Sequence, residues 1–161
     1  KGSLISMILS PDSDIVACGS QDNSVHFWRR STQRDSMMSG YPLKPASLSF
    51  DKTGCFLATG GDIDIMVWSF KGNGPEGTSP ICLKGHSQPI SSLAFARQGL
   101  NLASGARDGT VIVWALREDN QESHLSETRV SDCVSNLYWH PNNQVLAALD
   151  RQGGVTVWKV E

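Results

Sequence analysis

Long apolar runs are missing from this chain of 161 residues, and no stretch approaches the roughly 20 apolar residues that a membrane-spanning helix needs. An excess of one charge is missing as well, because 14 basic and 16 acidic residues leave a formal net charge of -2. Such a balance provides no electrostatic attraction for nucleic acid or for an anionic membrane surface. We therefore expect neither nucleic acid nor a membrane as a partner.

Cysteine is scarce and widely spaced, at Cys18, Cys55, Cys82 and Cys133. These spacings match neither a close pair of metal ligands nor a small disulfide framework. No two of the four histidines lie within five residues of each other, so a local metal signature is missing too. No Asn-x-Ser/Thr acceptor for glycosylation occurs. We expect no metal and no cofactor, and a cytoplasmic protein with buried thiols.

Sequence signatures of catalysis are also missing. No Gly-x-Ser-x-Gly motif of a serine hydrolase occurs. Residues 72–77 are rich in glycine, but Pro75 lies among them and no helical pattern follows, which excludes a phosphate-binding loop. The sequence therefore predicts no enzyme activity.

Tryptophan, in contrast, recurs at a regular interval. Each of four tryptophans ends a run of β-branched or apolar residues, at Trp28, Trp68, Trp114 and Trp158. Successive members lie 40, 46 and 44 residues apart. An interval of about 40–45 residues is typical of the blades of a β-propeller.

Two further strand-like runs precede each tryptophan run. The nearer runs are residues 16–19, 57–60, 102–105 and 146–149, and the more distant runs are 5–9, 46–50, 90–95 and 134–139. Large apolar residues alternate in the distant runs, which indicates strands. Asp108 and Gly109 separate two runs in the pattern that most strongly predicts a hairpin. More polar linkers, at 34–39, 79–84 and 124–130, are candidates for outer strands.

These residues resemble the WD-repeat family over the whole chain, and the third repeat is the best match. It contains Gly85 and His86 before the strands, then Ser104, Asp108 and Trp114. The resemblance implies a buried hydrogen-bonded network of the last four side chains, in which the aspartate anchors the imidazole. Such a network satisfies a buried indole N–H and a buried imidazole. We assign a structural, not a catalytic, role to these four residues.

The other repeats depart from the family pattern. The second repeat has Tyr41 in place of the histidine and keeps Thr59, Asp62 and Trp68. The first repeat keeps Asp22 and Trp28, and the fourth keeps only Trp158. We expect the second and fourth repeats to depend more on apolar stacking than on polar networks.

The expected fold is all-β, with four-stranded antiparallel sheets as the blades of a partial propeller. The repeats are expected at about 1–39, 40–84, 85–130 and 131–161. Because members of the family usually have about seven blades, the resemblance implies part of a longer propeller. The alternative is a homodimer, in which a second copy completes the ring.

The resemblance implies a protein–protein interaction scaffold without catalysis of its own. Partners of the family often bind the rim around the central channel, and the matching residues here include Ile5, Gln21, Lys44, Pro89, Arg107 and Arg151. The three cations among them favour a partner with an acidic surface. The alternative function is a regulatory or accessory propeller module of a larger enzyme or signalling protein.

Overall fold

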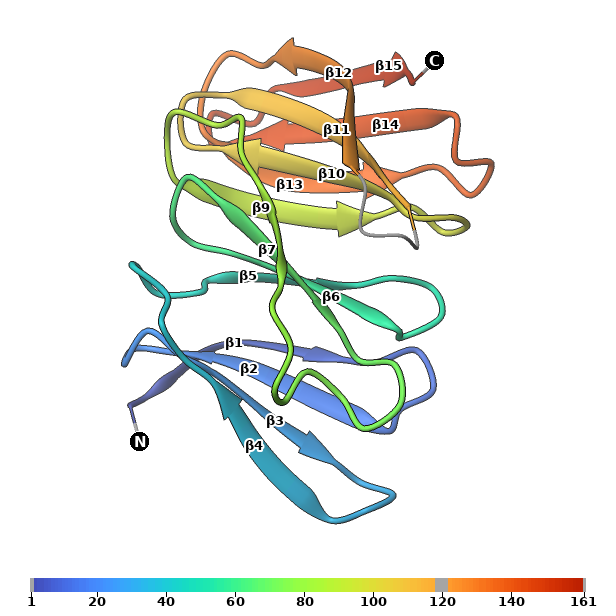
Figure 1. Ribbon diagram of the computed structural model, residues 1–161. Helices are drawn as coiled ribbons and strands as arrows, with labels where there is room; N and C mark the ends of the chain where they lie inside the picture. Colours follow the sequence, from blue (N-terminus) through green and yellow to red (C-terminus); the bar gives the residue numbers. More distant parts are fainter. Residues whose placement is uncertain (1, 118–121, 161) are drawn as a thin grey trace.

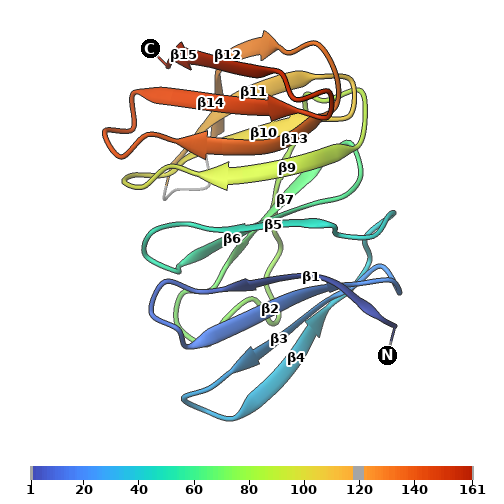
Figure 2. The ribbon, with the colours of Figure 1, turned by 180° about the vertical axis from the view of Figure 1, so that it is seen from behind.

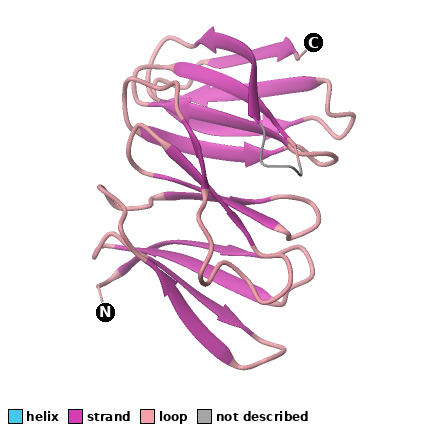
Figure 3. Ribbon diagram, viewed as in Figure 1, coloured by secondary structure: helices cyan, strands magenta, loops and turns pink. Residues whose placement is uncertain are grey.

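The computed structural model describes residues 2–117 and 122–160, and every regular element within them is a β-strand (Figure 3). The strands form four antiparallel sheets that stack one after another (Figure 1). The all-β, blade-like fold that the sequence predicts is therefore confirmed. No helix that might cross a membrane occurs among these residues.

The strands follow the chain in order within each sheet. The first sheet contains β1 (Leu4–Leu9), β2 (Ile15–Ser20), β3 (Val25–Arg29) and β4 (Arg34–Met38). The second contains β5 (Ser47–Phe50), β6 (Phe56–Gly60), β7 (Ile65–Ser69) and β8 (Ile81–Leu83). The third contains β9 (Ile90–Phe95), β10 (Asn101–Ala106), β11 (Thr110–Leu116) and β12 (Glu122–Arg129). The fourth contains β13 (Val134–Trp139), β14 (Val145–Asp150) and β15 (Val155–Lys159).

The turn between the first two strands is closed in the same way in every sheet. A main-chain N–H at the end of the first strand donates to a carbonyl five residues later. The four bonds are Ser10 to Ile15 at 2.8 Å, Asp51 to Phe56 at 3.0 Å, Ala96 to Asn101 at 2.8 Å and His140 to Val145 at 2.9 Å. This repetition confirms at atomic level that the four units are copies of one supersecondary motif.

The core consists of three apolar clusters, each between two neighbouring sheets. Phe27 of the first sheet packs edge-on against Phe70 of the second, with ring centroids 5.1 Å apart. Ile65 and Ile112 belong to the cluster between the second and third sheets, and Val113 and Leu146 to the next. Burial of each such side chain contributes roughly 1.5–3 kcal/mol. Stacking, rather than any single sheet, therefore stabilises the array.

The first strands of the sheets lie along the inside of the array. β1 contacts β5, β5 contacts β9, and β9 contacts β13. All four begin on the same side of the molecule, and the first and fourth sheets lie at opposite ends of the array (Figures 1 and 2). The outward face of each end sheet is apolar, with Met7 76% exposed at one end and Val155 67% exposed at the other.

Candidate functional site

The third sheet contains a buried hydrogen-bonded network of three side chains. Trp114 Nε1 donates to Ser104 Oγ at 2.8 Å, and His86 Nε2 lies 2.7 Å from the same oxygen. Burial lowers the pKa of His86 to about 4, although the nearby Asp108 carboxylate opposes this shift. The imidazole is therefore neutral at pH 7, which suits a structural contact better than acid–base chemistry.

Asp108 lies near this network but is occupied by other groups. Its carboxylate accepts the Thr110 main-chain N–H at 3.1 Å and lies 3.8 Å from the Arg129 guanidinium. The expected hydrogen bond from Asp108 to the imidazole is not among the contacts in residues 2–117 and 122–160, and His86 Nδ1 makes no hydrogen bond there. Asp108 thus holds the turn and acts on His86 through its charge.

The second sheet contains a polar network of a different composition. Trp68 Nε1 donates to the Tyr41 hydroxyl at 2.7 Å, and that hydroxyl lies 3.0 Å from Thr59 Oγ1. Thr59 in turn donates to the Met66 carbonyl at 3.1 Å. Burial raises the pKa of Tyr41 to about 12, so the phenol keeps its proton and donates. We expected this repeat to depend more on apolar stacking than on a polar network, and the structure shows that Tyr41 completes such a network.

In the part of the chain that the structure describes, the Asp62 side chain makes no hydrogen bond to that network. Its main-chain carbonyl accepts the Ile90 N–H at 2.9 Å, which connects the second sheet to the third. A tyrosine hydroxyl that accepts from Trp68 and donates to Thr59 is already satisfied. The sequence signal for this arrangement was available, because Thr59 and Trp68 are kept at the positions of Ser104 and Trp114.

The tryptophans of the two end sheets pack differently from those of the middle sheets. In the first, His26 stacks on Trp28 with centroids 6.2 Å apart, and its Nε2 lies 3.8 Å from Asp22 Oδ2. A hydrogen bond from the Ser24 hydroxyl lowers the pKa of Asp22 well below its usual range. In the fourth sheet, Trp158 packs on the apolar cluster shared with the third sheet. That packing agrees with the expectation for the fourth repeat.

The residues expected at the rim are paired at the start of each sheet. The main-chain N–H groups of Gln21, Arg107 and Arg151 donate to the carbonyls of Ser3 at 2.9 Å, Pro89 at 3.1 Å and Cys133 at 3.0 Å, respectively. In the second sheet Gly61 fills this place, where a Cβ would lie 1.9 Å from the Lys44 carbonyl oxygen. We call these four positions and their partners the rim. Three of the four sheets therefore share this main-chain hydrogen bond, and Gly61 and Lys44 hold the matching place in the second.

A β-bulge accompanies the pair in three of the sheets. The register shifts at Ile5 in β1, at Ser91 in β9 and at Ser135 in β13. Bulges re-aim side chains at the ends of sheets and are common beside functional sites. The sequence pattern predicted none of these bulges.

The rim is exposed and carries charges of both signs. Lys44, Gln21, Arg107 and Arg151 are exposed, as is Ile5, whereas Pro89 is half-buried. Aspartates follow directly in the same turns, at Asp22, Asp62 and Asp108. In residues 2–117 and 122–160 no group of three His, Cys, Asp or Glu side chains is placed to hold a metal ion. The arrangement suits recognition of a surface by side chains that differ from sheet to sheet.

Comparison with known proteins agrees with this geometry. The sequence model described as "WD domain, G-beta repeat" matches residues 1–29, 40–69 and 77–115, together more than half of the chain. The solved structure titled "Structure of U3-55K" superposes with a TM-score of 0.82 at 22% identity, over 99% of this chain and 50% of that one. A chain of the "Crystal Structure of Mitotic Checkpoint Complex" superposes with a TM-score of 0.83 at 22% identity, over 98% and 49%.

Relatives in sequence include components of several protein complexes. The "Target of rapamycin complex subunit wat1" of Schizosaccharomyces pombe is 25% identical over 89% of this chain and 45% of its own length. "Cell division cycle 20.1, cofactor of APC complex" of Arabidopsis thaliana is 28% identical over 96% and 34%. The "Serine-threonine kinase receptor-associated protein" of Dictyostelium discoideum is 34% identical over 71% and 38%. The chain thus spans less than half the length of these relatives.

Proposed function

Since this chain belongs to the WD domain, G-beta repeat family, we propose that it is a protein–protein interaction scaffold without catalysis of its own. The rim is the proposed binding surface. One observation carries this proposal: the same main-chain hydrogen bond recurs in the first, third and fourth sheets, while the exposed side chain beside it changes from Gln21 to Arg107 to Arg151. The main-chain hydrogen bond stays the same while the exposed side chain beside it varies, and such variation allows specific recognition of a partner.

The proposed partner carries acidic side chains opposite Lys44, Arg107 and Arg151. Arginine is enriched among residues that dominate binding energy, because its planar guanidinium donates two parallel hydrogen bonds to one carboxylate. The neighbouring aspartates of the turns limit the net positive charge of the rim. They therefore favour discrete pairs with individual carboxylates over attraction to a uniformly acidic surface.

Quantitative affinity capture with matched variants tests this proposal. The chain, the double variant Arg107→Glu/Arg151→Glu and the control Arg30→Glu/Lys52→Glu are each used as bait in extracts of the source cells. Arg30 and Lys52 are exposed in turns at the opposite ends of the strands. Proteins retained by the parent and the control but lost by the rim variant are the expected result. Equal retention by all three baits would refute the rim as the binding surface.

A second candidate function is that of a regulatory or accessory propeller module in a larger enzyme or signalling protein. The observation in its favour is the limited coverage of relatives such as the one from Dictyostelium discoideum, of which this chain matches 38%. Sequencing the complete transcript decides between the two functions. A flanking catalytic domain would support the module, and blades alone would support the independent scaffold.

We also propose a cytoplasmic location for this protein. None of the four cysteines, all of which lie in the described part of the chain, forms a disulfide, and Cys18 and Cys133 are buried, as is usual where thiols are kept reduced. Imaging of a fluorescent fusion tests the location. Accumulation in the nucleus or in the secretory pathway would contradict it.

A further inference from the structure

A continuous groove follows the outer side of the contact between the first and second sheets. One wall is formed by β4 and residues 39–43, and the other by β7 and residues 70–80. Four adjoining hollows compose it, and each shares two residues with the next: Phe27 and Glu76, then Ser39 and Trp68, then Tyr41 and Met66. We call this feature the outer groove.

The middle of the outer groove is apolar because the second sheet leaves its tryptophan uncovered. In the third sheet Trp114 is only 3% exposed, and a Cβ at Gly85 would lie 2.8 Å from its ring. Gly40 holds the matching place before Tyr41, yet a Cβ there would meet no atom within 4 Å. Trp68 therefore remains half-buried and lines the groove together with methionine and proline side chains, namely Met37, Met38, Pro75 and Pro80.

The two ends of the outer groove differ in charge. Asp62 and Asp64 line one end, and no cationic side chain lines it. Tyr41 completes the polar network of this sheet with a hydroxyl group, and no hydrogen bond in the described structure ties Asp62 or Asp64 to that network. This end of the groove therefore favours a cation.

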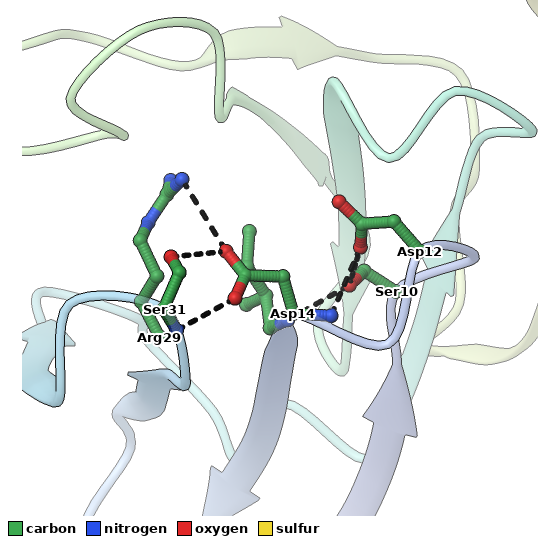
Figure 4. Close-up of polar contacts among 6 residues, drawn as sticks. Ser10, Asp12, Asp14, Arg29 and Ser31 are labelled. Carbon is green, nitrogen blue, oxygen red and sulfur yellow. Dashed lines mark hydrogen bonds and ion pairs between the residues drawn. The ribbon is translucent and has the colours of Figure 1, made fainter.

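The opposite end is formed by Arg29 and Arg34, with Glu76 as the single acidic residue lining it. Asp14 holds Arg29 at 3.8 Å and also binds the Ser31 main-chain N–H at 2.7 Å and hydroxyl at 2.8 Å (Figure 4). Arg29 Nη2 is buried and makes no hydrogen bond in the described structure. Asp14 and Glu76 balance the charge of the two guanidinium groups, but Arg29 Nη2, unpartnered in the described structure, still offers a hydrogen bond to an acidic side chain.

The size of the hollows indicates the kind of ligand. The two middle hollows have volumes of about 210 Å³ and about 180 Å³. Each is smaller than the roughly 300–1,000 Å³ of a typical small-molecule pocket, whereas a row of small hollows suits successive side chains of an extended peptide. An extended octapeptide covers roughly 26 Å, comparable with the wall formed by residues 34–43.

We propose that the outer groove binds an extended peptide segment of another protein. Its middle residues are apolar, a lysine or arginine meets Asp62 and Asp64, and an acidic residue meets Arg29 and Arg34. The Asp62 end of this second docking surface adjoins the rim at Gly61, whereas its middle and its Arg29 end contain no rim residue.

Fluorescence anisotropy with two synthetic octapeptides of equal composition tests the proposal on the full chain. The first peptide has two glutamates, then Leu-Pro-Leu-Leu, then two lysines, and the second has the four charges together in the middle. We expect the first to bind at least about tenfold more tightly. Equal affinity of the two peptides, or no binding of the first at 1 mM, would overturn the proposal.

Substitutions in the groove locate the binding. Ser39→Trp, at an exposed residue shared by the two middle hollows, should weaken binding of the first peptide by about tenfold or more. The control Ser123→Trp, on the exposed outer strand of the third sheet, should not change it. If Ser39→Trp does not fold, the double variant Asp62→Asn/Asp64→Asn provides the test. We expect it to weaken binding of the first peptide by roughly threefold or more. Unchanged affinity in the groove variants would show that the peptide binds elsewhere.

Discussion

At the scale of single residues, Tyr41 and His86 occupy the same place in two polar networks but have different side-chain chemistry. Both stand before the first strand of a sheet. Tyr41 bonds Trp68 and Thr59 directly, whereas His86 bonds Ser104, which accepts from Trp114. The phenol accepts one hydrogen bond and donates another, and both partners are present. The imidazole has a second ring nitrogen that no hydrogen bond satisfies. The two networks therefore respond differently to substitution and to pH.

Tyr41→Phe should destabilise the fold by about 1–3 kcal/mol, because the Trp68 N–H and the Thr59 hydroxyl both lose a partner in a half-buried site. Urea unfolding followed by tryptophan fluorescence measures this change. The matched control is Tyr138→Phe, since Tyr138 is 55% exposed and its hydroxyl bonds only an exposed Arg97. A loss no larger than that of the control would contradict the buried network.

His86 makes stability depend on pH in a defined direction. Its pKa of about 4 lies below the value of about 6.5 expected in the unfolded chain, so the unfolded state binds more protons between these values. The contribution of neutral His86 to the stability of the fold is fully present above pH 6.5 and is lost as the pH falls towards 4. We expect roughly 2 kcal/mol less stability at pH 5 than at pH 7 from this group alone. Unfolding curves of the parent and of His86→Tyr isolate it, because the phenol does not titrate in this range. Parallel pH profiles would contradict the assignment.

At the scale of elements, the second strand of each of the first three sheets carries a glycine where the next sheet enters. A Cβ at Gly60 would lie 2.7 Å from Ile90 Cγ2, and one at Gly105 would lie 2.4 Å from Val134 Cγ1. Leu149 holds the matching place in the fourth sheet and is 39% exposed. Close stacking of neighbouring sheets thus depends on the missing side chain.

Gly105→Ala should therefore cost about 1–3 kcal/mol, because the added methyl group forces the third and fourth sheets apart. Leu149→Ala, at the same place on an uncovered face, should change stability by less than about 0.5 kcal/mol. Thermal unfolding of both variants beside the parent measures the difference. An equal effect of the two substitutions would show that sheet stacking does not require the glycine.

The elements could be predicted from the sequence, whereas several contacts between them could not. Alternating apolar residues and the spacing from Trp28 to Trp158 predicted the inner three strands of each sheet, and polar linkers predicted the outer strands, which the structure confirms. The bulges at Ser91 and Ser135, however, were not predicted by the alternation of apolar residues. The outer groove depends on residues 34–43 and 70–80 lying side by side, which no local pattern encodes.

At the scale of the whole molecule, the two end faces of the array are its largest apolar exposures. Met7 and Leu9 are 76% and 52% exposed on the first sheet, and Val155 and Val157 are 67% and 60% exposed on the fourth. Exposed apolar faces of this kind promote association in water. We expect either further blades or a second copy of the chain to cover these faces.

The 161-residue chain should accordingly associate through its end faces. Light scattering coupled to size exclusion should give a mass above that of the monomer at high concentration. Met7→Lys/Val157→Lys should lower that mass, whereas Leu125→Lys, on the outer strand β12, should not. A monomer at every concentration would contradict association through these faces, and a clean dimer would support closure of the ring by two copies.

Photo-crosslinking tests the central claim, that the rim holds partner proteins, most directly. A photoreactive phenylalanine analogue is placed at Gln21 on the rim, or at Lys52 in the exposed turn at the opposite ends of the strands. Each chain is then irradiated with the partner recovered by affinity capture. Cross-links from position 21 and none from position 52 are the expected result. Cross-links from position 52 alone would place the partner on the opposite side and contradict the account.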